Sequence, residues 1–281
     1  MKLLIAGAFG KLGTDILKAA IANGHEVIAV DMVIREIENL PKESYTAKKI
    51  DVTNKESLKG ICHGVEGVIT TVGLTSSSAT VTNYDIDYQG NLNLLEEAKS
   101  AGVKYFGYVS VLKADGDPSV PMLHAKHLLE QELKKGGIQY TIFRPTGYFY
   151  DIAKVFMPMI EKGTVTLLGK KPVHANVIDT TDLADFILKH FTDNCETYNI
   201  GGTETYSYEE IATMFFEAAG KPVKIKRAPA FLFTILAALA KRKKNGKEAI
   251  IKFSKWTLSN EMVGEIKYGK LSFKEYIKNC Y

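Results

Sequence analysis

The sequence predicts an α/β fold with a doubly wound parallel sheet and a smaller C-terminal part. Three observations lead to this prediction. Short apolar runs alternate with helical patterns through the first 150 residues, the connections between them are short, and a glycine-rich turn follows the first apolar run. Regular alternation of strand and helix is typical of a parallel sheet that is covered on both faces.

The first strand is expected at residues 3–7, because LLIAG is continuously apolar, as a strand buried on both faces should be. A helix follows at 11–23, where apolar residues recur at helical spacing until Asn23-Gly24 ends the pattern. The remaining strands are expected at 25–30, 45–52, within 64–73, at 103–111 and at 138–145, with helices at 91–102 and 124–137.

Composition is typical of a globular protein, with 46% hydrophobic and 24% charged residues. The cysteines at 62, 195 and 280 show no CxxC spacing, so neither a disulfide framework nor a metal site is expected. The first strand leaves no room for a signal peptide, and no apolar run reaches the roughly 18 residues of a membrane span. We therefore expect a cytoplasmic protein.

Charge is unevenly distributed along the chain. Residues 221–281 carry fifteen Lys or Arg and four acidic residues, a net charge of 15 − 4 = +11, so the rest carries 4 − 11 = −7. The densest basic run, KRKKNGK at 241–247, follows the apolar run AFLFTILAALA at 230–240. One interpretation is a helix that touches a membrane surface or an acidic protein partner. The other is a buried C-terminal helix with a solvated basic last turn.

The turn after the first strand reads GAFGKLG, with Gly7, Gly10 and Gly13. The first glycine can make the tight turn, the second allows close approach of a pyrophosphate, and the third allows the helix to pack on the strand. Free N–H groups at the helix start would face the phosphates. The spacing is G-x-x-G-x-x-G, and its position between a strand and a helix favours a dinucleotide site.

Acidic residues after the second and third strands fit the rest of such a ligand. Asp31 can accept hydrogen bonds from an adenosine ribose and would repel a 2′-phosphate, which favours NAD. Arg35 lies nearby and keeps NADP open. Asp51 and Val52 are candidates for the adenine. Alternatively, Asp31 is a loop or cap carboxylate, and Asp51 or Thr53 caps the helix that starts near Asn54.

Several segments together resemble a known superfamily. They are GAFGKLG, IDVTN at 50–54, DYQGNLNLLEEAKSAGVKYFGYVS at 87–110, the helix that carries Lys126, and TIFRPTGYF at 141–149. In order and spacing they resemble the short-chain dehydrogenase/reductase superfamily, and its atypical NmrA-like, isoflavone-reductase-like and divinyl-chlorophyllide-reductase-like branch. The resemblance implies a Rossmann-type NAD(P)-binding core at residues 1–150 and a substrate-binding portion at 151–281 that is intertwined with the core.

The resemblance also implies a set of site residues. Those expected at the cofactor are Gly7, Ala8, Phe9, Gly10, Lys11, Leu12, Gly13, Asp31, Asp51, Val52, Thr71, Val72, Gly73, Ser110, Lys126, Pro145, Thr146, Gly147 and Tyr148. Those expected at the substrate are Tyr148, Tyr150, His174 and Asn176, with Asp179 or Thr180 capping the following helix. His124 and His127 are expected to be partly exposed, and no metal site is expected.

Standard members of the superfamily use a Tyr-x-x-x-Lys pair, in which the lysine lowers the tyrosine pKa and holds the ribose. Aligned on Lys126, the tyrosine position is Met122, and the family's serine position falls on Leu112. Lys126 then has three interpretations: a ribose clamp, a catalytic acid or base, or a solvated lysine that balances Glu130. Tyr148 is a candidate to replace the missing tyrosine; the alternative for Tyr148 and Tyr150 is aromatic packing.

Two functions follow from this pattern. The first is an NAD(P)-dependent oxidoreductase that acts on an activated C=C or C=O bond of a small, partly apolar molecule. The alternative is a non-catalytic NAD(P)-binding redox sensor, regulator or assembly factor, for which the basic C-terminal region offers a contact surface. The sequence shows no helix-turn-helix or basic-aromatic motif, so no nucleic-acid partner is expected. It offers no signal for an oligomeric state.

Overall fold

The computed structural model describes residues 1–74, 78–169, 171–229, 231–243 and 246–281. The chain divides into two compact units. Unit 1 comprises Met1–Ser76, Val81–Arg144 and Leu183–Tyr198, and unit 2 comprises Ser77–Thr80, Pro145–Asp182 and Asn199–Tyr281. The chain thus returns to unit 1 after it has entered unit 2, and the C-terminal half contributes elements to both.

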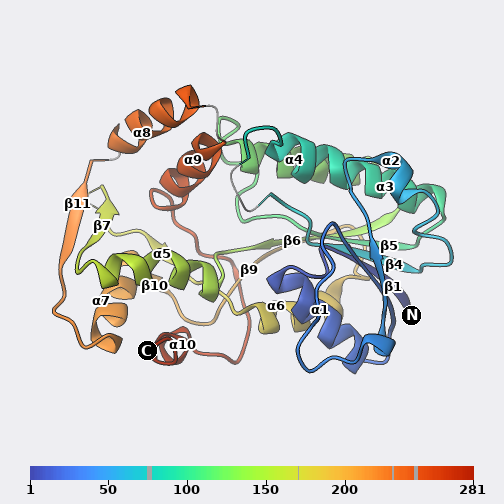
Figure 1. The fold of residues 1–281 in the computed structure, drawn as a ribbon, viewed down its shortest axis with the longest axis horizontal. Helices are drawn as coiled ribbons and strands as arrows, with labels where there is room; N and C mark the ends of the chain where they lie inside the picture. Colours follow the sequence, from blue (N-terminus) through green and yellow to red (C-terminus); the bar gives the residue numbers. More distant parts are fainter. Residues whose placement is uncertain (75–77, 170, 230, 244–245) are drawn as a thin grey trace. The chain divides into compact units, whose positions relative to one another are not determined.

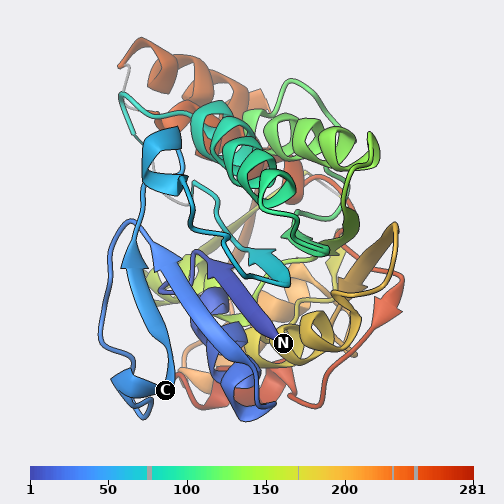
Figure 2. The same cartoon turned by 90° about the vertical axis from the view of Figure 1, so that its right-hand side faces the viewer.

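Parallel strands form the sheet of unit 1, as the sequence predicts. The strands are β1 (Lys2–Ala6), β2 (Glu26–Asp31), β3 (Thr46–Lys49), β4 (Gly67–Thr70), β5 (Tyr105–Val109) and β6 (Gln139–Pro145). Their order is β6-β5-β4-β1-β2-β3, and the full sheet continues beyond β6 with β9 (Glu196–Gly201) and β12 (Ile266–Lys267). Figure 2 shows the blue strands β1 and β2 side by side, in register from Lys2 opposite Glu26.

Helices cover both faces of this sheet. They are α1 (Lys11–Ala22), α2 (Lys55–Leu58), α3 (Asn91–Ser100), α4 (Pro121–Lys134) and α6 (Thr180–His190), with a 3₁₀ turn at Lys42–Ser44 and a π-helix at Tyr84–Gly90. In Figure 1, α3 and α4 lie on one face and α1 and α6 on the other. Leu4 and Phe106 of the sheet belong to one core cluster with Leu94 of α3 and Leu129 of α4, all four fully buried. This burial holds the helices over the strands.

Strand order sets where a ligand can bind in unit 1. The chain runs outward from β1 to β2 and β3, then returns to place β4 on the other side of β1. The carboxyl ends of β1 and β4 therefore meet, and the amide of Thr71 donates to the carbonyl of Ala6 over 2.9 Å. In doubly wound sheets such a switch point opens the crevice in which ligands bind.

The largest differences between the observed and the expected element boundaries are those of α4 and β3. Helix α4 begins at Pro121, not at residue 124, because proline has no N–H to lose and is well suited to the first turn. The third strand is limited to Thr46–Lys49, and all four of its residues are exposed. It is the edge of the sheet, where charged side chains protect the unpaired strand face.

Unit 2 combines helices with short strands. Its further elements are α5 (Phe149–Glu161), β7 (Val165–Leu168), β8 (His174–Ala175), β10 (Tyr206–Ser207), α7 (Tyr208–Ala218), β11 (Ile225–Ala228), α8 (Phe231–Arg242), α9 (Lys247–Thr257) and α10 (Phe273–Lys278). Strand β11 pairs with β7, and β10 pairs with β8. Rings of Phe149, Phe156, Phe215 and Phe273 form its aromatic core.

Helix α8 contradicts one of the two interpretations of the apolar run at 230–240. A buried core helix would hide its large side chains, yet within Phe231–Arg242 only Ala237 and Ala240 are buried. Phe231 is 60% exposed and Ile235 is 50% exposed. The expectation of a buried helix is therefore wrong, while Ala230 and residues 244–245 lie outside the described residues. In the described part of the chain, no helix is both long and apolar enough to cross a membrane.

Candidate functional site

The glycine-rich turn has the geometry that its three glycines predict. Gly7 adopts φ +77°, a left-handed conformation that favours glycine, and a Cβ there would lie 2.5 Å from the hydroxyl oxygen of Thr71. A Cβ on Gly13 would lie 2.0 Å from the carbonyl oxygen of Gly7. Gly10 is exposed at the start of α1. The turn is therefore tight, and helix α1 packs directly onto it.

The start of α1 offers backbone N–H groups for an anion. Its N-cap is Gly10, no side chain caps this end, and its first turn contains no acidic residue. Ala8, Phe9 and Leu12 are buried, so their contribution to a ligand would come from the backbone. Lys11 is exposed and pairs with Asp15 at 3.2 Å. An uncapped helix start with a glycine turn fits a phosphate group.

Asp31 ends β2 and organises the same turn. One of its carboxylate oxygens accepts from the amide of Phe9 at 3.1 Å, and the other accepts from the amide of Met32 at 2.7 Å. Asp31 thus serves as a loop carboxylate, and its oxygens retain lone pairs for a ribose hydroxyl. Arg35 is exposed.

Asp51 and Val52 follow β3 and also have structural contacts. The Asp51 carboxylate accepts from the amide and the hydroxyl of Thr53 at 2.9 and 2.7 Å, while Asn54 is the N-cap of α2. Asp51 therefore shapes the turn before the helix instead of capping it. The Val52 side chain is buried in the core cluster. Their assignment to the adenine stays a prediction.

Lys126 is the most informative side chain of unit 1. It is 8% exposed, and its ammonium nitrogen lies 3.2 Å from the carboxylate of Asp87 and 3.3 Å from the carbonyl oxygen of Val109, to which it donates. It also lies over the ring of Tyr108, 5.4 Å from the centroid. The interpretation of Lys126 as a solvated partner of Glu130 is therefore wrong.

Asp87 was not identified from the sequence, although it is fully buried beside Lys126. It belongs to the π-helix Tyr84–Gly90, and such widened turns are frequent at functional sites. One oxygen faces Lys126, and the other accepts from the amide of Leu74 and the side-chain amide of Asn83. A Cβ on Gly73 would lie 2.8 Å from Asp87, so the segment that follows β4 runs directly past this pair.

Ser110 and Arg144 form a second buried polar cluster with Glu130. The Ser110 hydroxyl donates to Glu130 at 2.5 Å, and Arg144 binds Glu130 through two nitrogens at 2.9 and 2.5 Å. Hydrogen bonding to Glu130 raises the pKa of Arg144. The cluster anchors α4 to the ends of β5 and β6 and thereby fixes the helix that carries Lys126. The Ser110 hydroxyl is thus already engaged.

The positions at which the family's tyrosine and serine are expected hold no hydroxyl group. Met122 is partly exposed in the first turn of α4, and Leu112 is buried. Tyr108 is fully buried, and its hydroxyl has no hydrogen-bond partner among the described residues. Burial, with the nearby carboxylates of Asp87 and Glu130, raises the pKa of Tyr108 well above its ordinary value. Tyr108 therefore remains neutral and is no substitute for an activated tyrosine.

The residues after β6 that were predicted for cofactor and substrate lie in unit 2. The Thr146 hydroxyl donates to the carbonyl of Asn176 at 2.7 Å, and Gly147 accepts from the amide of Ile178 at 2.9 Å. Pro145 is buried at the end of β6. These contacts hold the segment in place, and its contact with a cofactor stays a prediction.

Tyr148 and Tyr150 stack with ring centroids 5.7 Å apart. Desolvation raises the pKa of Tyr148 well above its ordinary value, and Tyr150 and Asp151 add to this effect. A phenol in these surroundings holds its proton. Tyr148 therefore lacks the lowered pKa that a lysine gives the tyrosine of the standard pair.

Asn176 does not face a substrate. It is fully buried, its side-chain oxygen accepts from the amide of Gly264, and its amide group donates to the carbonyls of Gly202 and Gly264. The prediction for Asn176 is wrong, because its polar group joins three backbone segments. His174 is partly exposed and lies 3.2 Å from Glu261. The capping role of Asp179 is confirmed, since it accepts from the amide of Thr181 at the start of α6.

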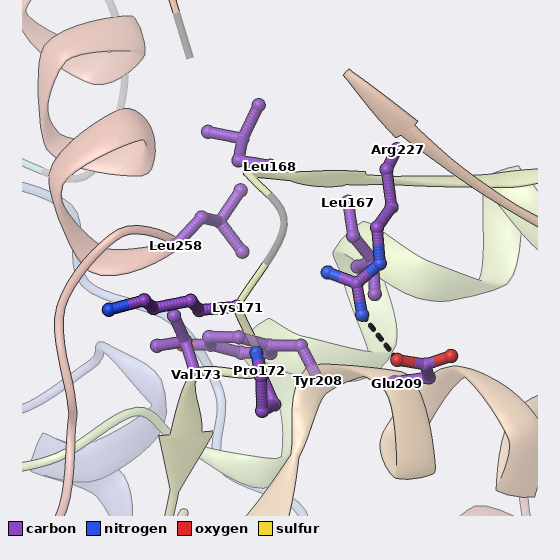
Figure 3. A pocket seen from close by; sticks show the side chains of 9 residues that line it. All are labelled: Leu167, Leu168, Lys171, Pro172, Val173, Tyr208, Glu209, Arg227 and Leu258. Atoms are coloured by element: carbon purple, nitrogen blue, oxygen red, sulfur yellow. Dashed lines mark hydrogen bonds and ion pairs between the residues drawn. The ribbon is translucent and has the colours of Figure 1, made fainter. Parts of the chain in front are cut away.

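Unit 2 also has a small pocket, shown in Figure 3, that contains none of the predicted site residues. Its lining includes Leu167, Tyr208 and Leu258, with an ion pair between Arg227 and Glu209 at its edge. Burial raises the pKa of Tyr208, so this phenol is neutral. Most of the lining side chains are apolar, and its charged groups are the Arg227–Glu209 pair and Lys171.

Family comparison agrees with the geometry of unit 1. The model of the NmrA-like family matches residues 1–269, nearly the whole chain. The chain belongs to the NmrA-like family. The resemblance inferred from the sequence motifs is thereby confirmed.

The relatives of this NmrA-like protein include one named as an assembly factor and one named as a reductase. It is 29% identical over 240 residues to the photosystem II assembly factor Ycf39 of Cyanophora paradoxa, and the alignment covers 83% of this chain and 73% of that protein. It is 24% identical over 270 residues to divinyl chlorophyllide a 8-vinyl-reductase of Arabidopsis thaliana, and the alignment covers 86% of this chain and 64% of that protein.

Solved structures confirm the Rossmann-type fold of the NmrA-like chain. Triphenylmethane reductase of Citrobacter sp., complexed with NADP(H), superposes with a TM-score of 0.74 at 19% identity over 100% of both chains. UDP-glucose 4-epimerase of Thermus thermophilus, complexed with NAD, gives a TM-score of 0.67 at 22% identity and covers 82% of this chain and 86% of that chain. At these identities the likeness establishes the fold alone.

Proposed function

We propose that this NmrA-like protein binds a nicotinamide dinucleotide on unit 1 and uses it to reduce a small, partly apolar molecule at an activated C=C or C=O bond. One observation carries the proposal: a lysine on α4 is buried at the carboxyl ends of β4 and β5 and is paired with Asp87. The complexes of the structurally similar reductase and epimerase with NADP(H) and NAD support it.

The residues of unit 1 fit such a cofactor. Gly7 and Gly13 leave no room for a side chain, and the uncapped start of α1 suits a pyrophosphate. Asp31 would accept from a ribose hydroxyl and disfavour a 2′-phosphate, so NAD is favoured over NADP. Exposed Arg35 is the residue that would favour NADP instead.

The bound cofactor would supply the hydride. The chain itself would hold the nicotinamide ribose through the ammonium group of Lys126, which has three donors and already engages Asp87 and Val109. Asp87 would keep this ammonium in place. Because Met122 cannot transfer a proton, the third N–H of this ammonium, in place of the ribose contact, is the candidate proton donor on α4 for a developing enolate or alkoxide.

Calorimetric titration of NAD, NADH, NADP and NADPH into the wild type and into Lys126→Ala tests this proposal. Binding of one pair to the wild type, weakened about tenfold or more in the variant, is expected for a charged ribose contact. Lys134→Ala, an exposed lysine near the end of the same helix, is the matched control. If none of the four binds the wild type, the proposal fails.

A second function is supported by specific observations. Met122 and Leu112 stand where the standard pair and serine would be, and a relative at 29% identity is named an assembly factor. On this account the protein binds the dinucleotide without turnover and acts as a redox-dependent regulator or assembly factor.

Turnover separates the two functions. We expect oxidation of the preferred reduced cofactor by at least one member of a panel of quinones, enals and enones, with loss in Lys126→Ala. Tight binding without turnover, together with different affinities for the oxidised and reduced forms, would instead support the regulator.

A further inference from the structure

Helix α8 presents large apolar side chains to solvent along one face. The exposed fractions are 60% for Phe231, 40% for Leu232, 50% for Ile235, 49% for Leu236 and 48% for Leu239. These residues are spaced by three and four positions, so they share one side of the helix. Single exposed apolar residues are ordinary on protein surfaces, but a continuous stripe of this kind marks an interaction site.

The opposite side of α8 already has a partner within unit 2. Ala237 and Ala240 are buried there, and Thr234 accepts a hydrogen bond from Lys255 of α9 at 2.9 Å. Figure 1 shows the orange helix α8 beside the red helix α9. The helix is thus attached to unit 2 through its small residues, while its large residues are left for another contact.

Positive charge continues the apolar face at its C-terminal end. Arg242, three positions after Leu239, ends α8 on the same side of the helix, Lys243 follows it directly, and both are exposed. Neither the sequence of α8 nor the basic run that follows it to residue 247 contains an acidic residue. A partner that matches this face must therefore be apolar inside and negatively charged at its surface.

We propose that the exposed face of α8 docks onto the surface of a bilayer that contains anionic phospholipid. Phe231, Ile235 and Leu239 would enter the boundary between headgroups and acyl chains, while Arg242 and Lys243 would contact phosphates. With 12 residues, α8 is too short to span a bilayer and would lie in the plane of the interface. This inference concerns a surface of unit 2 and is independent of the proposed function.

A second copy of the chain fits this face less well. Two copies of α8 would bury their apolar residues but would leave the charges of Arg242 and Lys243 without acidic counterparts on the same face. An anionic lipid surface satisfies both parts of the face at once, because the cationic ends of such side chains reach headgroups while the apolar residues are buried.

Vesicle co-sedimentation of the full chain tests the proposal. The probes are vesicles of phosphatidylcholine alone and of phosphatidylcholine with phosphatidylglycerol, each at low and at physiological salt. We expect binding to the anionic vesicles, at least about tenfold weaker binding to the neutral ones, and a decrease as salt rises. Absence of binding to the anionic vesicles at low salt would overturn the proposal.

Two double variants separate the apolar from the charged contribution. Ile235→Asn with Leu239→Asn should weaken binding about tenfold or more, because two side chains lose their burial. Arg242→Gln with Lys243→Gln should weaken binding to anionic vesicles about tenfold at low salt and leave neutral vesicles unaffected. Circular dichroism and thermal unfolding confirm that each variant folds.

Matched controls come from elsewhere in unit 2. Val223→Thr with Leu271→Asn removes two apolar side chains that are each 50% exposed, and Lys274→Gln with Lys278→Gln removes two exposed charges from α10. Both should bind like the wild type. If the controls weaken binding as much as the α8 variants, α8 is not the docking element.

Light scattering after size exclusion tests the competing occupant. The wild type and the Ile235→Asn, Leu239→Asn variant should have the same mass in the absence of lipid. A wild-type dimer that the apolar variant dissociates would assign this face to a contact between copies and overturn the proposal.

Discussion

Two regions depart from the usual distribution of polar and apolar residues, and they do so in opposite directions. Around Lys126 in unit 1, charged groups are buried: Asp87 and Glu130 are fully buried, and Lys126 and Arg144 are each 8% exposed. On α8 in unit 2, five large apolar side chains are 40–60% exposed. Each of these buried charges has an opposite charge beside it. The five apolar side chains of α8, in contrast, are not covered by the described residues of the chain.

The difference predicts how each region responds to amino-acid substitution. A buried charge is stable only while its partner stays in place, so the first region is rigid and sensitive to substitution. An exposed apolar side chain costs little in the folded state, so the second region can be altered with little loss of stability and is free to serve an external contact.

Removal of Glu130 should give the largest effect. Glu130→Ala leaves Arg144 buried without its main counter-charge, and we expect a loss of about 3–5 kcal/mol in the free energy of unfolding. Urea denaturation measures it. Glu96→Ala, which breaks the exposed pair with Lys55, should cost less than about 1 kcal/mol. Similar losses in the two variants would contradict the contrast between buried and exposed pairs.

The pair of Asp87 and Lys126 should show strong coupling. We expect Lys126→Met and Asp87→Asn each to destabilise unit 1 by about 2–3 kcal/mol, because each leaves a buried polar partner uncompensated. In the double variant part of the loss should return, with a coupling energy of about 1–3 kcal/mol. Strictly additive losses in a double-mutant cycle would show that the contact carries no energy.

Gly13→Ala should have a moderate and local effect. Its Cβ would lie 2.0 Å from the Gly7 carbonyl oxygen, so α1 must shift, at a cost of about 1–3 kcal/mol and with weaker dinucleotide binding. For stability, Gly10→Ala is the control, since its Cβ would meet that oxygen at 3.3 Å. Thermal unfolding would contradict this account if the two variants lost the same stability, and calorimetry compares dinucleotide binding by Gly13→Ala with that by the wild type.

Substitution on α8 should have the smallest effect on stability. Ile235→Asn and Leu239→Asn each replace a half-exposed side chain, and we expect each to change the free energy of unfolding by no more than about 0.5 kcal/mol. A loss of about 2 kcal/mol or more per site, roughly the cost of a core substitution, would mean that α8 is part of the core. Urea denaturation of the double variant decides this.

The sequence by itself determined the α/β class, the alternation of strands and helices through residue 145, and the glycine turn at residues 7–13. These features depend on local patterns, namely apolar runs, helical spacing and residues that tolerate unusual backbone conformations. Such patterns can be recognised in a single sequence. The NmrA-like resemblance depended on the same short motifs. The Asp179 turn and the break at Asn23-Gly24 belong to this local class as well.

Only the tertiary structure decided which polar groups meet. Asp87 and Lys126 lie on different helices, and the residues of the Glu130 cluster come from a helix and two strand ends, so no local pattern pairs them. The sequence likewise did not show that Asn176 is buried or that α8 is exposed. For α8 the reason is that an apolar run has the same sequence pattern whether it packs in the core or forms an outer contact surface. Burial is a property of the packed chain, and it determined the environment of Lys126.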